Sequence, residues 1–159
     1  MTMMPEAALY LNAKSTAHPR KAAPNPAANP VEAQARPLRV LVVEDDPDTA
    51  DSMQVLLELL GYQAGVAYNG LAAVTVARNF QPDVVLCDLA LPGMDGFAVA
   101  AALRREPDLA RVRLIAVSGY APESAPCRRP TTFERHLVKP VALDELQTTL
   151  QACRRFGTD

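Results

Sequence analysis

The sequence predicts a doubly wound α/β fold, in which a five-stranded parallel sheet carries helices on both faces. One observation behind this prediction is a set of short, continuously apolar runs, which are typical of strands covered on both sides. A second is that segments with helical spacing alternate with these runs, as expected of parallel strands joined by helices. A third is that four runs each end at a polar residue: 38–43, 84–87, 114–117 and 136–138.

The first strand, within residues 38–43, leads into a helix that has both ends marked. Asp46 is a candidate N-cap, and Pro47 suits the first helical position, where a missing N–H costs nothing. Gly61 is a typical residue just past a helix end. Between these ends the apolar residues recur at helical spacing: Met53, Leu56, Leu57 and Leu60.

The remaining elements follow the same alternation. A strand over 62–67 and a turn at Asn69 and Gly70 precede a second helix over 71–79. The inward residues of that helix are expected to be Leu71, Val74 and Ala77. The other predicted elements are strands over 84–87, 113–117 and 137–139, a helix over 97–105 closed by Pro107, and a last helix over 143–154.

The first 37 residues differ in composition from the rest of the chain. They are rich in Ala and Pro and offer few side chains that a core could bury. Ordering the backbone costs about 1 to 2 kcal/mol per residue in conformational entropy. The burial of so few apolar side chains does not offset that cost. We expect a disordered tail over residues 1–37, either inert or a docking arm, followed by one domain over residues 38–156.

Charge, hydropathy and cysteine content exclude several classes of function. The formal net charge is −2, so electrostatics favour neither nucleic acid nor an acidic membrane as a partner. No apolar stretch approaches the roughly 20 residues of a membrane helix, and the amino terminus lacks the features of a secretory signal. The cysteines Cys87, Cys127 and Cys153 show no close spacing, which favours a reducing compartment. We expect a cytoplasmic protein.

Acidic residues follow two of the apolar runs. Glu44, Asp45 and Asp46 place three carboxylates within one turn, an arrangement that suits Mg²⁺. The alternative is a solvated loop in which Asp46 caps the helix. Asp88 stands against a buried strand, where a charge is costly unless it is paired or metal-bound. Asp88 can act as a nucleophile that forms an aspartyl phosphate, or it can simply form a turn.

A hydroxyl and an amine follow the other two runs. Ser118 can donate a hydrogen bond, although Ser-Gly is also a common turn pair. Lys139 offers a positive charge to a phosphoryl oxygen, although a lysine before a proline is also typical of a surface. Because the carboxyl ends of parallel strands meet at one edge of a sheet, we expect the acids, the hydroxyl and the amine to lie together. The combination suits a divalent cation and a phosphoryl group.

Four spaced motifs resemble the receiver domain of two-component response regulators, which belongs to the CheY-like superfamily and has a flavodoxin-like fold. The motifs are 42–47 (VVEDDP), 88–96 (DLALPGMDG), 117–120 (VSGY) and 136–140 (HLVKP). The likeness covers residues 38–155, after which four residues follow. The resemblance therefore implies a stand-alone receiver that signals through protein partners.

The resemblance implies that Asp88 is the phosphoacceptor, phosphorylated by a sensor histidine kinase or a phosphotransfer protein in a Mg²⁺-dependent reaction. It implies that Asp45, Asp88 and the backbone carbonyl of Ala90 bind Mg²⁺ directly, while Glu44 acts through a metal-bound water. Beyond self-catalysed phosphotransfer to Asp88 and autodephosphorylation, it implies no enzymatic activity.

The resemblance also implies roles for three residues near the phosphoryl group. Ser118 and Lys139 would hold phosphoryl oxygens. In the family, the position of His136 often carries an aromatic ring that turns inward when the Ser or Thr is drawn toward the phosphate. His136 is therefore either part of a switch with Ser118 or a partly exposed strand residue.

The span between Ser118 and Lys139 departs from the family pattern. Pro122, Pro126 and Pro130 interrupt the segment where the family has a helix, and a proline inside a helix costs on the order of 3 kcal/mol. We expect an irregular fourth helix and a remodelled output face. This departure favours an alternative function, a phosphorylation-independent interaction module. The least favoured alternative function is a small phosphatase that uses Asp88 as its nucleophile. Such an enzyme would need a second acidic residue two positions after Asp88, which this chain lacks.

Overall fold

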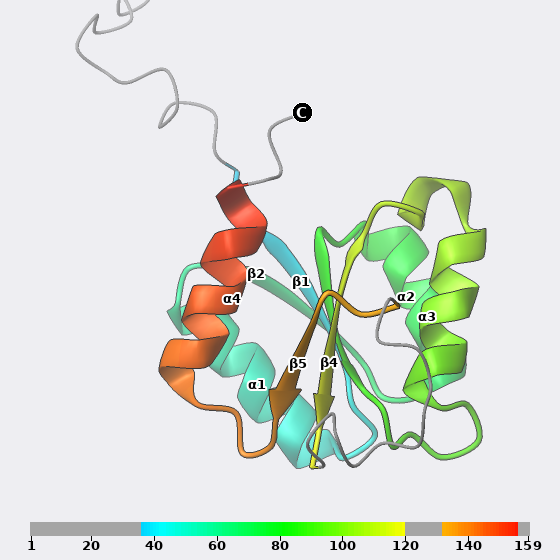
Figure 1. The fold of residues 1–159 in the computed structure, drawn as a ribbon, viewed down its shortest axis with the longest axis horizontal. Helices are drawn as coiled ribbons and strands as arrows, with labels where there is room; N and C mark the ends of the chain where they lie inside the picture. The colour runs from blue at the N-terminus through cyan, green and yellow to red at the C-terminus, as the bar shows by residue number, and fades with distance from the viewer. Residues whose placement is uncertain (1–35, 120–131, 156–159) are drawn as a thin grey trace, which may run out of the picture. The chain divides into compact units, whose positions relative to one another are not determined.

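The computed structural model describes residues 36–119 and 132–155, which form a five-stranded parallel sheet with helices on both faces (Figure 1). The strand order is β2-β1-β3-β4-β5. The strands are β1 (Arg39–Val43), β2 (Gln63–Ala67), β3 (Val84–Asp88), β4 (Arg113–Ser118) and β5 (Arg135–Val138). The helices are α1 (Pro47–Leu59), α2 (Gly70–Phe80), α3 (Gly96–Arg105), α4 (Leu143–Arg155) and a short 3₁₀ helix, η1 (Pro107–Leu109). The predicted fold class is confirmed.

Each central strand buries side chains on both faces of the sheet. In β1, Leu41 and Val43 pack into the core that α2 and α3 cover, whereas Val40 and Val42 pack into the core that α1 and α4 cover. Burying one such side chain contributes about 1.5 to 3 kcal/mol. Because successive strand residues point to opposite faces, two covered faces require a continuously apolar strand, which is the pattern of the sequence.

Polar residues occupy the N-cap positions of three helices. The side chains of Asn69 and Asp95 cap α2 and α3, each accepting a hydrogen bond from a backbone N–H of the first turn, at 2.7 and 2.8 Å. Asp46 occupies the N-cap position of α1, as predicted. Its carboxylate makes no bond to a backbone N–H of the helix and instead accepts the hydroxyl of Thr49.

The structure corrects two details of the prediction. Leu71 does not face the core: it is 76% exposed, and the buried residues of α2 are Gly70, Ala73 and Ala77. Small residues on this face let the helix approach its neighbours closely, because a Cβ at Gly70 would lie 2.8 Å from the Cβ of Met94. The last strand begins at 135 rather than 137, because residues 135 and 136 also pair with residues of β4.

The described structure begins within the segment predicted to be a tail. Arg36 forms an ion pair with Asp83 at 2.7 Å, and the backbone N–H of Arg39 donates to the same carboxylate at 2.8 Å. Residues 1–35, 120–131 and 156–159 lie outside the described residues, and with them lie the predicted tail, the predicted irregular fourth helix and Cys127. In the part of the chain that the structure describes, no helix is long and apolar enough to cross a membrane.

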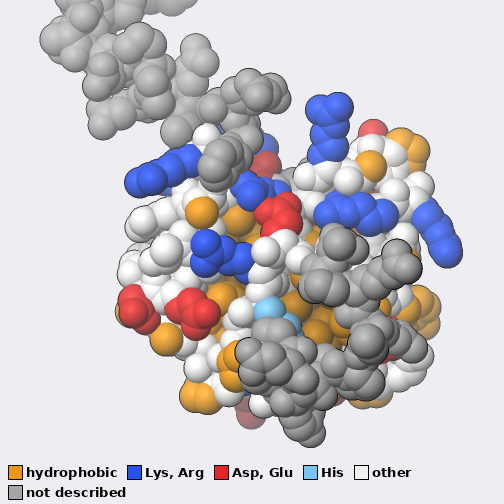
Figure 2. Space-filling model, viewed as in Figure 1, with side chains coloured by type: hydrophobic (Ala, Val, Ile, Leu, Met, Phe, Trp, Pro, Cys, Tyr) orange, Lys and Arg blue, Asp and Glu red, His pale blue; other side chains and the backbone are white. Residues whose placement is uncertain are grey.

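Charged side chains are distributed unevenly along the strand direction. Arg39, Arg113 and Arg135 are the first residues of their strands, and the last turns of α2, α3 and α4 carry further arginines. Figure 2 shows basic side chains mainly in the upper part of the view, opposite the end to which the β4 and β5 arrows point in Figure 1. Cations near helix C-termini interact favourably with the helix dipole. The carboxyl edge of the sheet, by contrast, carries the acidic residues that follow β1 and end β3.

Candidate functional site

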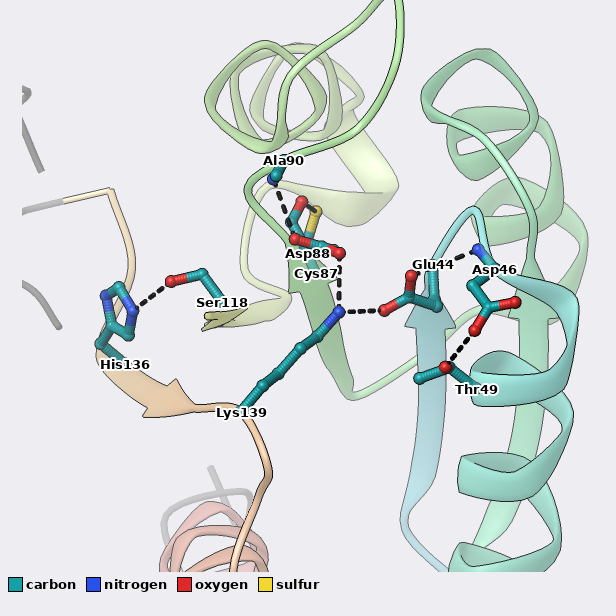
Figure 3. A network of polar contacts seen from close by, with 9 residues as sticks. All are labelled: Glu44, Asp46, Thr49, Cys87, Asp88, Ala90, Ser118, His136 and Lys139. Carbon is teal, nitrogen blue, oxygen red and sulfur yellow. Dashed lines mark hydrogen bonds and ion pairs between the residues drawn. The ribbon is translucent and has the colours of Figure 1, made fainter. Parts of the chain in front are cut away.

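The polar residues at the strand ends lie together at the carboxyl edge of the sheet. Glu44 directly follows β1, Asp88 ends β3, Ser118 ends β4 and Lys139 directly follows β5. The parallel register of these four strands brings their ends level. Figure 3 shows the four side chains at this edge, with Lys139 between Glu44 and Asp88. The juxtaposition expected from topology is therefore present.

Lys139 bridges two buried carboxylates. Its Nζ donates to Oε2 of Glu44 at 2.5 Å and to Oδ2 of Asp88 at 2.7 Å. Glu44 and Asp88 are only 6% and 7% exposed. Burial alone would lower the pKa of Lys139, but hydrogen bonds to Asp88 and Glu44 outweigh it and raise that pKa. The amine is thus held in its charged form beside the two acids.

Three carboxylates form a cluster at the same edge. One oxygen from each of Glu44, Asp45 and Asp88 lies within 4.8 Å of the others. Burial raises the pKa of Glu44, and the charge of Asp88 adds to that rise, whereas the hydrogen bond from Lys139 opposes it. With all groups ionised, three negative charges face the positive charge of Lys139.

This donor set fits a divalent cation. Mg²⁺ prefers oxygen ligands and usually takes one or two carboxylates while keeping several waters. Two oxygens bound to one Mg²⁺ can lie up to about 4.2 Å apart, which is comparable with the 4.8 Å within which the oxygens of the cluster lie. Asp45 is exposed while Glu44 and Asp88 are buried, so the cluster is open to solvent on one side. Asp46 does not belong to this cluster, since its carboxylate binds Thr49 at the start of α1.

The backbone after β3 holds the Asp88 side chain in place. The N–H of Ala90 donates to Oδ1 of Asp88 at 2.9 Å, so the two oxygens of this carboxylate have different partners. Gly96, at the start of α3, packs directly on the same backbone: a Cβ there would lie 2.5 Å from the carbonyl oxygen of Asp88. The sequence shows this glycine within a motif but does not show the contact.

Ser118 and His136 contact each other. Ser118 Oγ lies 2.8 Å from Nε2 of His136, and Ser118 is only 3% exposed. The backbone carbonyl of Ser118 accepts a hydrogen bond from the N–H of Lys139 at 2.8 Å. The sequence leaves His136 either as a switch residue or as a partly exposed strand residue; the structure shows a half-buried side chain bonded to the hydroxyl.

Cys87 precedes Asp88 but is an unreactive thiol. It is 1% exposed, and burial, followed by the nearby charge of Asp88, raises its pKa to about 12. Since the thiolate is the reactive form of cysteine, Cys87 contributes volume to the core rather than chemistry to the site.

A cleft of about 460 Å³ opens beside the carboxylates. Its polar lining includes Thr49 and Ser52 of α1, together with Asp88 and Lys139. Most of the remaining wall is apolar: Val42, Val43, Met53, Leu56, Leu86, Val117 and Val141. Thr49 and Ser52 carry no signal in the sequence, because only the docking of α1 brings them next to the strand ends.

Known proteins share this sequence pattern. The chain matches the model of the response regulator receiver domain over residues 40–151. It is 32% identical to protein PilH of Pseudomonas aeruginosa over 115 residues, which cover 72% of this chain and 95% of PilH. It is 29% identical to the DNA-binding dual master transcriptional regulator RpaA of Synechocystis over 118 residues, which cover 74% of this chain and 49% of RpaA. The chain thus spans about half the length of RpaA but nearly all of PilH.

A solved structure shares the fold. The receiver domain of the sensor histidine kinase PA1611 from Pseudomonas aeruginosa is similar with a TM-score of 0.68 and 28% sequence identity. The match covers 76% of this chain and 99% of that domain. In that crystal structure a magnesium ion is coordinated in the active site cleft.

Proposed function

Because the chain belongs to the response regulator receiver domain family of two-component systems, we propose that it accepts a phosphoryl group on Asp88 and signals through protein contacts. The phosphodonor would be the phosphohistidine of a sensor kinase or of a phosphotransfer protein. The observation that carries the proposal is the meeting of Asp88 with Lys139 and two further carboxylates, brought together from separate strands.

The transfer is a substitution at phosphorus. An oxygen of Asp88 attacks the phosphorus atom, a P–O bond forms, and the P–N bond to the donor histidine breaks. The electron pair of that bond stays on the imidazole, which leaves as a neutral ring once protonated by solvent. The bond from Ala90 to Oδ1 and the bond from Lys139 to Oδ2 orient the Asp88 carboxylate before the attack.

The residues for a divalent cation are those of the acidic cluster. Asp45, Asp88 and the backbone carbonyl of Ala90 would hold Mg²⁺, with Glu44 beside them. The bound cation would supply positive charge that offsets the charge of the phosphoryl oxygens in the transition state. This role is consistent with three clustered carboxylates beside the ammonium of Lys139.

Lys139 and Ser118 would bind the product. In the unphosphorylated protein the ammonium of Lys139 bonds Oδ2 of Asp88, and after transfer it would bond a phosphoryl oxygen instead. Ser118 would donate its hydroxyl proton to another phosphoryl oxygen. Both bonds would change the positions of the Ser118 and Lys139 side chains at the ends of β4 and β5, which offers a route from chemistry to partner affinity.

Incubation with acetyl phosphate and Mg²⁺, followed by intact-mass measurement, tests this function. The wild type should gain the mass of one phosphoryl group, while Asp88→Asn, or wild type with a chelator, should gain none. Asp95→Asn is the matched control, because Asp95 lies in the same β3–α3 connection and caps α3 through Oδ1, which Asn retains. An unmodified wild type would contradict the proposal and favour a phosphorylation-independent interaction module.

A further inference from the structure

The two ends of the sheet carry opposite charge. Every arginine of the described residues lies at the amino end of the strands, either at or shortly before the first residue of a strand or in the last turn of a helix. The opposite end carries the carboxylate cluster and the acidic first turns of α1 and α4. A protein with a formal net charge of −2 therefore has a basic surface at one end, in the upper part of Figure 2.

Part of this basic charge is neutralised within the chain. Three ion pairs lie at the amino end: Arg36–Asp83, Arg78–Glu106 and Arg113–Glu134. In each pair the guanidinium donates two hydrogen bonds to one carboxylate. This forked arrangement is the geometry in which arginine recognises a carboxylate. The amino end thus already binds carboxylates, each from its own chain.

The other exposed arginines at this end form no ion pair or hydrogen bond with residues 36–119 or 132–155. We call this set the arginine edge: Arg105, Arg111, Arg135, Arg154 and Arg155. Those in the last turns of α3 and α4 interact favourably with the helix dipoles. Arg111 and Arg135 lie outside the helices, so the dipoles do not account for them. Glu58 and Asp108, the other acids at this end, are too few to balance the set.

We propose that the arginine edge is a docking surface for an acidic segment of a partner protein, whose Asp and Glu side chains form the same forked bonds. A continuous phosphate backbone fits this surface less well. Double-stranded DNA carries one negative charge about every 1.7 Å, and such a chain of charges would be repelled by the carboxylates of the three ion pairs. A peptide can place neutral residues beside them.

This surface goes beyond the proposed function, because it lies at the end of the sheet opposite Asp88. Asp88 ends β3, whereas Arg135 begins β5 and Arg111 precedes β4. Docking here leaves the phosphoacceptor open to solvent and to its phosphodonor. The partner would therefore be bound both before and after phosphorylation.

Fluorescence anisotropy with a labelled peptide of alternating Glu and Gly, at low ionic strength, tests the docking surface. Arg111→Gln and Arg135→Gln should each weaken binding about 1.5- to 5-fold, the value of one exposed ion pair. Added salt should weaken the binding of wild type, because it screens exposed charges. A wild type that does not bind the peptide, or variants that bind it as tightly as wild type, would overturn the proposal.

A variant with the opposite effect does not depend on the loss of an arginine. Glu106→Gln removes the carboxylate that neutralises Arg78 and should tighten peptide binding by a similar factor. Asp144→Asn is the matched control, because it changes the net charge equally but lies in the first turn of α4, at the other end of the sheet. It should leave affinity unchanged. Equal tightening in both variants would show that net charge alone governs binding, and would contradict a docking surface.

Two further measurements identify the class of partner and separate this surface from the phosphoacceptor site. A single-stranded oligonucleotide of the same charge should bind more weakly than the peptide; tighter binding would contradict a protein partner. Asp88→Asn should bind the peptide as wild type does, and weaker binding would contradict a surface independent of phosphorylation. A wild type that binds the peptide but gains no phosphoryl group contradicts the proposed function alone. Normal phosphorylation without peptide binding contradicts only the docking surface.

Discussion

At the scale of single residues, the charge balance of the site depends on Lys139. Its ammonium lies within hydrogen-bond distance of both Glu44 and Asp88. Because these bonds raise the pKa of Lys139 despite its burial, its folded-state pKa lies above the unfolded value of about 10.4. The contribution of this group to stability is therefore complete below about pH 10 and is lost as the pH rises through the raised pKa.

Lys139→Gln should lower the free energy of unfolding by about 1 to 3 kcal/mol at pH 7. This is less than the 3 to 5 kcal/mol that is typical of breaking a fully buried pair, because the Lys139 side chain is 30% exposed and solvent screens it. The loss should shrink as the pH falls through the pKa of Glu44, which burial raises, since Glu44 then takes up a proton. Urea unfolding at several pH values measures both effects. A loss that is independent of pH would mean that lost packing rather than lost charge is responsible.

At the scale of elements, the contact between α3 and β3 positions the phosphoacceptor. The N–H of Gly96 donates to the carbonyl of Leu89 at 3.2 Å, and a Cβ at Gly96 would lie 2.9 Å from the Cα of Leu89. Helix and strand backbones therefore touch immediately after Asp88. Only a residue without a side chain allows this approach.

Gly96→Ala should destabilise the protein by about 1 to 3 kcal/mol, the usual cost of an added methyl group in a packed interior. It should also slow phosphorylation by acetyl phosphate, because the backbone of Asp88 has to move. Gly119→Ala is the stability control: a Cβ there meets no atom of the described residues within 4 Å, and the change should stay within about 0.5 kcal/mol. Thermal unfolding of both variants provides the comparison. Equal stabilities would refute the close contact at Gly96.

Helix ends were more predictable from sequence than helix faces. The residue pair Asp46-Pro47 marks the start of α1 as predicted, because the residues that favour a helix start are neighbours in the chain. The cap of α3 by Asp95 was not predicted. The buried face of α2 was partly mispredicted, since Leu71 is exposed. Which face of a short, mostly apolar helix is buried depends on the neighbours it docks against, and those are distant in sequence.

At the scale of the whole molecule, folding concentrates acidic charge at one edge of the sheet. The three clustered carboxylates repel one another, and this repulsion lowers the free energy of unfolding. A cation that binds only the folded protein would offset it. Mg²⁺ binding and the global stability of the protein should therefore be coupled.

Mg²⁺ at ten times its dissociation constant should raise the free energy of unfolding by about 1.4 kcal/mol, measured as a rise in Tm that a chelator reverses. Asp45→Asn should remove most of this rise, because Asp45 belongs to the carboxylate cluster. Asp46→Asn is the matched control: it is the next residue, exposed and bonded to Thr49 instead. A similar rise in both variants would place the cation elsewhere.

The sequence by itself determined the alternation of strands and helices, the fold class and the residues that end the strands. These follow from local periodicity, from capping and from the rule that parallel strands share a carboxyl edge. Only the tertiary structure decided which of those residues touch. Lys139 reaches Glu44 across 95 positions in the chain, and His136 meets Ser118 through the register of two strands. Such contacts depend on how distant elements pack, and local sequence patterns do not encode that packing.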